Sequence, residues 1–556
     1  MRDDRGTVLG RAIGGQSRQV LLAGALAAGH QAGEALVPVL IGVVIDRAVS
    51  TGSSTELLLW LAALAAVFAG LSASFRFGAR AAERASQQAG HEIRVRLTRR
   101  VLHPGGGAEA DRLSGALVNI ATGDARRVGG VNTVVSAGIA ALTGLLVSAV
   151  ALLWISVPLG LVVLLGAPPV LWLGGLLGRP LERRSAVEQE RAAHASGLAT
   201  DLVAGLRVLK GIGAESAAVA RYRRTSQESL AATLRASRAQ AWHDGAILAL
   251  TGVFIAAVAL VGGRLAAQGE ISVGDLVAAV GLALFLLAPL QLFAWVNGEF
   301  ARGRASAARI GEVLSAPPAV AAGPGQFPSV VRGQVALAGV THGPLRGVDL
   351  DVAPGELLGV VTPDPAAATA LLACLAREVD PAAGAVTLDG VPLSTVDPAE
   401  VRGAILHAAH HADLFAGTLA ANVALDDRDV LPAMSAAAAD EVALSLPEGA
   451  VLTERARSLS GGQRQRVALA RALAADPPVL LLHDPTTAVD TVTEARIATG
   501  IRDVRHGRTT ILVTTSPALL AAVDRVVLLD DGTVRAQGTH ESLVATDPGY
   551  RKAVLS

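Results

Sequence analysis

Long stretches with almost no charged side chains alternate with charged stretches over about the first 300 residues of the chain. Six apolar stretches are long enough to cross a hydrocarbon layer of roughly 30 Å, which takes about 20 helical residues. They lie at 20–46, 57–77, 132–155, 158–178, 244–264 and 275–297. We therefore predict an all-α polytopic membrane domain of six helices over residues 1–314.

The polar loops between these stretches alternate between long and short. Arginines concentrate in the two long loops, 78–131 and 179–243. Basic loops mark the cytoplasmic side of a membrane, so both long loops and both chain ends are expected in the cytoplasm, with the protein in the cytoplasmic (inner) membrane. The first apolar stretch is longer than a signal-peptide core and lacks a small-residue cleavage site, so it is expected to remain in the mature protein.

Alanine-rich sequence laced with Glu and Arg fills parts of both long loops. At 79–90 and 182–209 this composition favours helices that continue well past the bilayer into the cytosol.

The last 226 residues differ from the first part of the chain in their pattern of apolar residues. Residues 315–330 are rich in Pro, Gly and Ala without periodicity, which indicates a linker. From 331 to 556, short apolar runs alternate with helix-like stretches. The runs lie at 355–361, 478–483, 509–514 and 524–532. This alternation predicts an α/β domain built on a mainly parallel sheet.

Composition excludes several classes of protein. With 51% hydrophobic and 17% charged residues over 556 positions, the chain is too apolar for one soluble domain. Basic and acidic residues number 48 each, so no surface for nucleic acid is indicated. The single cysteine, Cys374, excludes an internal disulfide framework and a cysteine-rich metal site.

The most specific motif is LSGGQRQRVALARALAADP at 459–477. Its serine and two glycines directly precede a strong helix-forming run, so their N–H groups and hydroxyl can face a phosphate at a helix N-terminus. This motif resembles the signature of ATP-binding cassette (ABC) transporters. VTLDGVPL at 386–393, DPTTAVD at 484–490 and VVLLDDGTVRAQGTHESLV at 526–544 resemble the same family in the same order.

The resemblance implies a half-transporter of the exporter fold, with six membrane helices and one C-terminal nucleotide-binding domain that uses ATP and Mg²⁺. It implies a dimer whose helices exchange between subunits, with contact helices placed near 103–114 and 208–216. In such a dimer the signature end of one chain closes on nucleotide held by the other. The residues of this chain that match those positions are Ser460, Gly461, Gly462, Gln463 and Asp490.

The stretch matching the phosphate loop G-x-x-G-x-G-K-[ST] is abnormal. It runs from Thr362 to Thr369 and has Ala368 where the family has lysine, so the charge that reaches the β- and γ-phosphates is missing. Pro365 and Ala367 replace glycines; proline donates no N–H and alanine resists positive φ. Asp364 adds negative charge. Only the hydroxyl of Thr369 remains as a possible Mg²⁺ ligand.

Four further family positions are altered. In VLLLHDPTTAVD the register puts His483 at the metal acid and Asp484 at the catalytic glutamate; a histidine is a poor ligand for Mg²⁺, which prefers oxygen. His410 replaces the glutamine that bridges metal and membrane domain. Thr515 replaces the histidine that senses the γ-phosphate. The segment 339–348 also lacks an aromatic side chain to stack on adenine.

These losses affect the chain's own nucleotide pocket and spare the face offered to a neighbour. The hypothesis is that the chain is the degenerate half of a heterodimeric exporter. Its partner would be a second half-transporter with an intact phosphate loop, catalytic glutamate and switch histidine. Alternatives are an ATP-insensitive membrane receptor or regulator that kept the cassette as a docking module, an importer of exporter fold, a homodimer with two incompetent sites, and random decay.

Ionisable residues inside membrane helices are costly and often functional. His30 and Glu34 are spaced i, i+4 and would share one face of the first helix, either lining a substrate cavity or forming a structural pair. The substrate could be a small molecule, a lipid or a peptide, and contact with membrane lipid is expected throughout.

Overall fold

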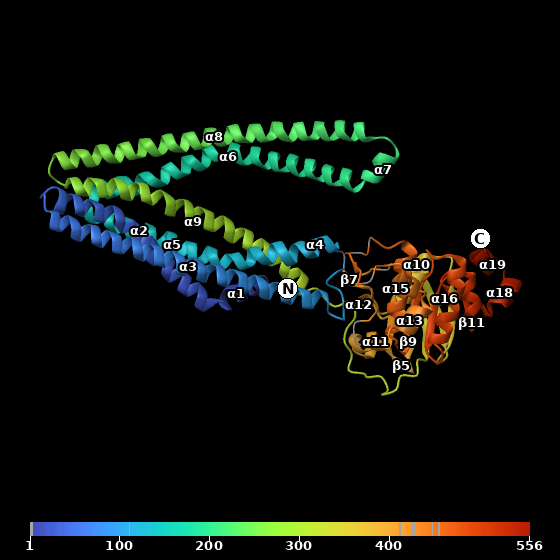
Figure 1. The fold of residues 1–556 in the computed structure, drawn as a ribbon. Coiled ribbons are helices and arrows are strands. Elements are labelled where there is room, and N and C mark those ends of the chain that lie inside the picture. Colours follow the sequence, from blue (N-terminus) through green and yellow to red (C-terminus); the bar gives the residue numbers. More distant parts are fainter. Residues whose placement is uncertain are drawn as a thin grey trace. The chain divides into compact units, whose positions relative to one another are not determined.

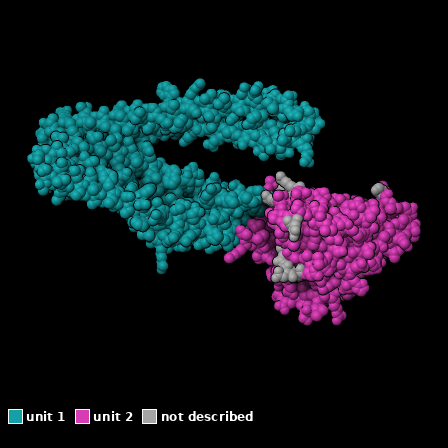
Figure 2. All heavy atoms as spheres, viewed as in Figure 1, with its two compact units in different colours: residues 1–97, 114–314 teal, residues 98–113, 315–556 magenta. Residues whose placement is uncertain are grey.

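The computed structural model describes residues 4–110, 112–410, 413–424, 429–447, 449–453, 456 and 458–555. Within them the chain forms two compact units, residues 1–97 with 114–314, and residues 98–113 with 315–556 (Figure 2).

Long helices make up the first unit (Figure 1). They are α1 (Asp4–Gly14), α2 (Ser17–Val44), η1 (Ile45–Val49), α3 (Ser54–Val101), α4 (Ser114–Asn119), η2 (Ile120–Asp124), α5 (Ala125–Ile155), α6 (Val157–Ala204), α7 (Leu206–Gly211), α8 (Glu215–Ala267) and α9 (Val273–Leu314). At 48, 48 and 53 residues, α3, α6 and α8 far exceed a bilayer crossing, which confirms the predicted extensions past the apolar stretches.

Five helices among the described residues are long and apolar enough to cross a membrane, against the six predicted. They are the helical stretches 54–101, 114–155, 157–204, 215–267 and 273–314. The predicted first crossing, 20–46, corresponds to α2, which has 28 residues but carries His30, Gln31 and Glu34 near its middle. The sixth crossing therefore stays a prediction. Large apolar side chains face outward from the five, including Trp154 and Leu248 at 89% and 75% exposure.

Two carboxylates, one partly buried and one buried, join helices of this unit that are distant in sequence. Asp46 in η1 accepts hydrogen bonds from the Gly274 amide (2.9 Å) and the Ser272 hydroxyl, which ties the end of α2 to the start of α9. Asp124, only 2% exposed, accepts from Ser306 Oγ (2.9 Å) and Arg309 Nε (2.8 Å). The bond from Arg309 lowers the pKa of Asp124, so this carboxylate stays charged and anchors η2 to α9.

The predicted contact helix at 103–114 is wrong. The described residues between α3 and α4 form turns and irregular chain, because Pro104 and the three glycines 105–107 interrupt any helix. Instead, Arg100 reaches the linker, donating to the carbonyls of Gly106 (2.9 Å) and Ala316 (2.7 Å). The second predicted contact helix, 208–216, overlaps α7, which ends at Gly211; a turn then leads into α8.

The second unit contains two large sheets. A six-stranded sheet has the order β12-β11-β3-β10-β9-β6 and is parallel except for the β11–β12 pair, as predicted. A four-stranded antiparallel sheet, β2-β1-β4-β5, was not predicted. The strands are β1 (Val335–His342), β2 (Leu345–Val352), β3 (Leu357–Val361), β4 (Ala383–Leu388), β5 (Val391–Pro392), β6 (Ile405–Ala408), β7 (Gly417–Thr418), β8 (Val451–Leu452), β9 (Val479–His483), β10 (Thr509–Val513), β11 (Arg525–Asp530) and β12 (Thr533–Gly538).

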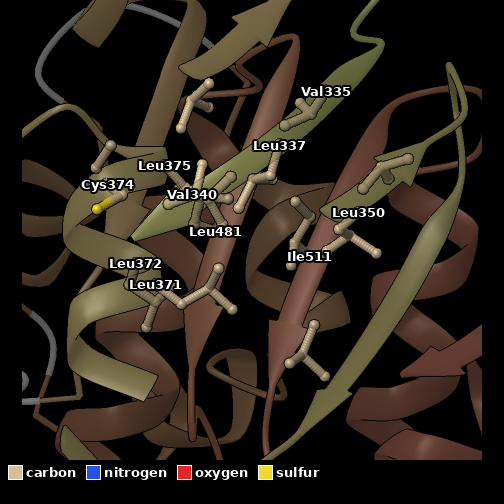
Figure 3. Close-up of a cluster of buried hydrophobic side chains, with 14 of the residues drawn as sticks. Val335, Leu337, Val340, Leu350, Leu371, Leu372, Cys374, Leu375, Leu481 and Ile511 are labelled. Atoms are coloured by element: carbon tan, nitrogen blue, oxygen red, sulfur yellow. The ribbon is translucent and has the colours of Figure 1, made fainter. Parts of the chain in front are cut away.

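Helices surround these sheets. They are α10 (Pro365–Leu375), η3 (Leu393–Thr395), α11 (Pro398–Ala404), α12 (Leu419–Val423), α13 (Leu431–Ala436), α14 (Asp440–Leu444), α15 (Gly461–Ala474), α16 (Thr491–Val504), α17 (Pro517–Ala522), α18 (His540–Thr546) and α19 (Pro548–Leu555). The main core lies where α10 packs between the two sheets. Figure 3 shows Leu371, Leu372 and Leu375 of this helix beside side chains of β1, β2, β9 and β10.

A smaller cluster fixes the C-terminal helix. Tyr550 of α19 is fully buried against Val361, Leu520 and Val526, and its hydroxyl lies 2.8 Å from His540 Nδ1. Burial raises the pKa of Tyr550 to about 12.

This burial predicts a loss of stability in alkali. An unfolded tyrosine releases its proton near pH 10 while Tyr550 keeps it to about 12, so its contribution is full below pH 10 and falls as the pH rises toward 12. Two pH units correspond to about 2–3 kcal/mol. We expect Tyr550→Phe to flatten this alkaline decline, measured by urea unfolding at pH 8 and pH 10.5. Tyr222→Phe, at the only other tyrosine, should leave the decline unchanged.

Candidate functional site

The segment matching the phosphate loop joins β3 to α10 and already carries its own anion. Asp364 is the N-cap of α10, and its Oδ1 accepts a hydrogen bond from the Ala366 amide at 2.9 Å. Pro365 has no N–H to offer, and Thr369 Oγ1 donates to the Pro365 carbonyl at 2.9 Å. The end of the helix that would attract a phosphate is thus occupied by a carboxylate of the chain itself.

Residues from four strand ends and two helices surround a cavity of about 610 Å³ beside this loop. The sequence-predicted residues that line it are Thr362, Pro365, Ala368, His483, Asp484 and Thr515. Ala367 is instead buried in the core at 1% exposure, and the side chain of Thr369 is exposed. The parallel order of β3, β10 and β9 explains the assembly, because their carboxyl ends meet at one edge.

Lys552 of α19 also lines this cavity, and sequence reasoning missed it. It is one of only two lysines in the chain, which was the available signal, but 184 positions separate it from Ala368. The same wall carries the carboxylates of Asp484 and Asp530, the latter bonded to Arg535 at 2.7 Å. Because Arg535 pairs with Asp530, Lys552 stands against Asp484, and this wall has no net positive charge to attract a triphosphate.

His410 and His483 are brought together at the neighbouring strand ends. Ala408 of β6 pairs with Leu482 of β9, so the two rings follow on adjacent parallel strands, with centroids 5.7 Å apart. Asp484 has a left-handed backbone (φ 44°), and its Oδ2 lies 3.9 Å from His483 Nε2. Within the part of the chain that the structure describes, no group of three or more His, Cys, Asp or Glu residues is arranged to hold a metal. The histidine nitrogens at these two positions are poor ligands for Mg²⁺, which prefers oxygen.

The signature segment differs from the phosphate-loop segment in the way its helix is capped. Ser460 caps α15: its Oγ accepts from the Gln463 amide (3.2 Å), and Gln463 Oε1 accepts from the Ser460 amide (2.8 Å). A Cβ at Gly462 would lie 2.4 Å from the Ala488 carbonyl oxygen, so only glycine fits there. Ser460 and Gly461 stay exposed at the helix N-terminus, and the amides of Gly461 and Gly462 in the first turn of α15 can therefore donate to an external phosphate oxygen.

Gln465, which sequence reasoning also missed, ties this helix to the loop before α16. Its Nε2 donates to Thr487 Oγ1 at 2.7 Å, and its Oε1 accepts from the Ala488 amide at 2.8 Å. The loop ends at Asp490, the N-cap of α16, whose Oδ1 accepts from the Thr493 amide at 2.9 Å. That bond lowers the pKa of Asp490. Ser460 and Asp490 thus belong to one braced surface, although 30 residues separate them.

In the first unit, His30 and Glu34 lie on α2 as predicted, with His30 Nε2 3.8 Å from Glu34 Oε2. The other ring nitrogen of His30, Nδ1, is 3.0 Å from the Leu71 carbonyl of α3, and the ring packs 5.5 Å from that of Phe75. These contacts favour a structural role between α2 and α3 for His30. Glu34 remains half-exposed, at 48% of its side chain.

Comparisons with known families agree with this architecture. Residues 20–290 match the model of the ABC transporter transmembrane region, and residues 345–487 match the ABC transporter model. The chain is similar over 98% of its length to a solved structure of a bacterial Atm1-family ABC exporter with ATP bound, with a TM-score of 0.74 and 24% identity. It covers 98% of that chain. This likeness concerns the fold.

The curated relatives of this chain are named for different activities. The chain is 30% identical over 530 residues to a multidrug efflux ATP-binding/permease protein of Mycobacterium tuberculosis, covering 93% of this chain and 44% of that protein. It is 29% identical over 400 residues to an ATP-dependent lipid A-core flippase of Chromobacterium violaceum, covering 69% and 68% respectively. A mitochondrial potassium channel ATP-binding subunit of Xenopus tropicalis is 29% identical over 448 residues, covering 78% and 65%. The chain thus spans less than half of the first relative.

Proposed function

The chain belongs to the ABC transporter family, as an exporter-type half-transporter with a helical membrane domain before its nucleotide-binding domain, and from this we propose that it is the non-hydrolysing subunit of a heterodimer. The observation that carries the proposal is the self-capped phosphate loop. Asp364 holds the Ala366 amide at 2.9 Å, where a nucleotide phosphate would need it, and the lysine position is Ala368. The cassette of this family binds ATP with Mg²⁺, but in this loop Pro365 removes one amide donor, Asp364 occupies another, and no lysine supplies charge.

The exposed surface formed by Ser460, Gly461 and Gly462 supports a role at the nucleotide bound by the partner subunit. Ser460, Gly461 and Gly462 stand at the free end of a 14-residue helix, and Gln465 braces them against the Asp490 loop. In the proposed heterodimer this surface closes over ATP and Mg²⁺ bound to an intact partner loop. Preorganised amides and a hydroxyl then stabilise the charge that develops on the partner's γ-phosphate.

The membrane unit supports assembly with a second subunit. Toward α7, the hairpin of α6 and α8 stands apart from the other helices of its unit, which Figure 2 shows as an open space. The end of this hairpin exposes Val203, Val208 and Ile212 by 66–73%, and Val203 also lines a small apolar cavity of about 330 Å³ there. Apolar surface at the tip of a charged hairpin is typical of a protein contact, and we assign it to the partner's cassette.

The chain is a multi-pass membrane protein. We place it in the cytoplasmic membrane with both termini inside, on the arginine content of the two long loops. Closure of the cassettes on ATP and their release after hydrolysis would switch the membrane cavity between inward and outward access. The transported substrate is a small molecule, a lipid or a peptide, a range that includes the drugs and lipid A core named for two relatives.

Purifying the full chain without a partner tests whether its own nucleotide pocket is inactive, as this proposal requires. We expect no ATP turnover above a preparation without protein, and no saturable binding of a fluorescent ATP analogue at millimolar Mg²⁺, because the loop lacks its lysine and has lost amide donors to Pro365 and to the Asp364 cap. The reference is the complex co-purified with a half-transporter that has an intact phosphate loop, which should hydrolyse ATP. Robust Mg²⁺-dependent hydrolysis by this chain alone would refute the proposal.

A further inference from the structure

A pocket between α6 and α8 combines an apolar floor with two arginines. Its volume is about 680 Å³, and it is formed where these two helices run side by side (Figure 1). Leu177, Leu181 and Arg184 line it from α6, and Arg238, Trp242 and His243 line it from α8. No step of the proposed ATP chemistry uses this pocket.

The two arginines lie at the same depth relative to the apolar stretches. The fourth stretch ends at residue 178 and the fifth begins at 244, so Arg184 and Arg238 are each six residues outside. At about 1.5 Å per helical residue this places both about 9 Å beyond the hydrocarbon layer. The headgroup layer is roughly 5–8 Å thick on each side, and a flexible arginine side chain covers the difference. Both guanidinium groups can thus reach lipid phosphates.

No residue that the structure describes neutralises either arginine. Among the described residues, Arg184 and Arg238 make no ion pair or hydrogen bond, whereas Arg191, further along α6, pairs with Glu228 at 3.0 Å. The nearest carboxylate on α8, Asp244, accepts from Gln240 at 2.8 Å and lies 3.4 Å from His243. Two uncompensated guanidinium groups at one pocket favour a phosphate group, which accepts their planar pairs of N–H donors.

The apolar part of the pocket distinguishes a lipid from a soluble phosphate. Leu177 and Leu181 form the wall nearer the membrane, and Trp242 is 82% exposed beside them. Tryptophan favours the depth where acyl chains meet headgroups. A ligand that fills the pocket therefore needs an anionic head and an apolar tail.

We propose that this pocket binds an anionic phospholipid of the cytoplasmic leaflet, with Arg184 and Arg238 on its phosphate and Trp242 against its glycerol and upper acyl chains. The proposal rests on the membrane orientation given under the proposed function, and on nothing concerning ATP. Basic pockets between membrane helices on the cytoplasmic side bind anionic headgroups in this way.

The test is a nucleotide-free titration of the full chain in neutral detergent micelles with tail-brominated phosphatidylglycerol, read as quenching of Trp242. The Trp242→Phe chain provides the background of the other four tryptophans. Brominated phosphatidylglycerol should quench at lower concentration than brominated phosphatidylcholine. Arg184→Gln with Arg238→Gln should weaken phosphatidylglycerol binding roughly 30-fold, since each basic residue is worth about fivefold. Arg183→Gln with Arg235→Gln, on the same helices but off the pocket, should change it less than threefold.

Equal quenching by the two lipids in the unmodified chain would overturn the proposal, as would equal losses in the two pairs of variants. Displacement of phosphatidylglycerol by millimolar inorganic phosphate would assign the pocket to a soluble anion instead. The pair Arg184→Lys with Arg238→Lys controls for folding, because it keeps both charges and should retain most of the binding. The titration contains no ATP, so its failure and the failure of the heterodimer proposal are separate results.

Discussion

Replacing Ser460 by alanine is expected to lower ATP turnover by the co-purified heterodimer roughly 10- to 100-fold, the worth of one hydrogen bond to a charged group. The hydroxyl stands at the exposed N-terminus of α15, with the Gln463 amide as its partner inside the chain. In the closed heterodimer it would donate to the partner's γ-phosphate. Loss of the lysine from the partner's phosphate loop should abolish turnover altogether, since that charge has no substitute in this chain's own loop.

One control separates a phosphate contact from damage to the helix, and a second tests the chain's own nucleotide pocket. Ser460→Ala also removes an N-cap worth about 1 kcal/mol, whereas Ser460→Asp keeps the cap. If Ser460 meets a phosphate, the aspartate variant should be at least as inactive as alanine, because it brings a negative charge to the anion. If the hydroxyl serves only the helix, aspartate should restore turnover. Ala368→Lys should leave turnover within about twofold, because Pro365, Ala367 and Asp364 still exclude the phosphate.

This view would be contradicted if the complex with Ser460→Ala hydrolysed ATP as fast as the complex with the unmodified chain. A receptor or regulator that keeps the cassette only for docking predicts that result. A large gain from Ala368→Lys would also count against it, since it would mean that the chain's own pocket needs only a charge to work.

Replacing Arg377 by methionine is expected to cost the cassette about 3–5 kcal/mol of stability, in the range for a broken buried charge network. Its guanidinium is 2% exposed and donates to the carbonyls of Ala321 (2.6 Å), Ser394 (3.0 Å) and Val396, with Asp380 Oδ1 at 3.2 Å from Nε. Methionine would leave these carbonyl bonds unmade and free the linker at residue 321 from the cassette.

The lone cysteine provides a cassette-specific readout in the full chain. Cys374 is 1% exposed, and burial raises its pKa to about 11, so it should react with a maleimide only when the cassette opens. Arg377→Met should raise the labelling rate at least about 100-fold, which corresponds to the lower end of that cost. Arg346→Met provides the control, because its ion pair with Asp531 is exposed and should change the rate less than about threefold.

Cys374 is close to Arg377 in the chain, so the urea dependence of labelling must separate local from global opening. Global opening exposes much surface and gives a steep dependence. A faster rate in Arg377→Met with no urea dependence would mean local fraying only, and an unchanged rate would show that the network contributes little.

Residue identity alone predicted the degenerate loop, because the stretch 362–369 has alanine in place of the family's lysine and a proline that donates no N–H in any fold. The lengths of the apolar stretches and the helical extensions could also be predicted from the sequence, because hydrophobicity and helix propensity act locally. The turns at 102–110 were not predicted, because the contact helix expected there came from the family resemblance, whereas Pro104 and the glycines after it interrupt any helix. The antiparallel sheet was missed because its strands are short and half-buried.

Only the tertiary structure decided which distant residues meet. Parallel pairing of β6 with β9 sets His410 beside His483, α19 brings Lys552 to the same cavity as Ala368, and Arg377 binds the linker 56 residues away. The capture of the Ala366 amide by Asp364 is a local contact, but it depends on the backbone geometry at the start of α10. Sequence fixes which groups a chain possesses; their meeting depends on strand order and register, which are set by the packing of the whole domain and not by any one segment.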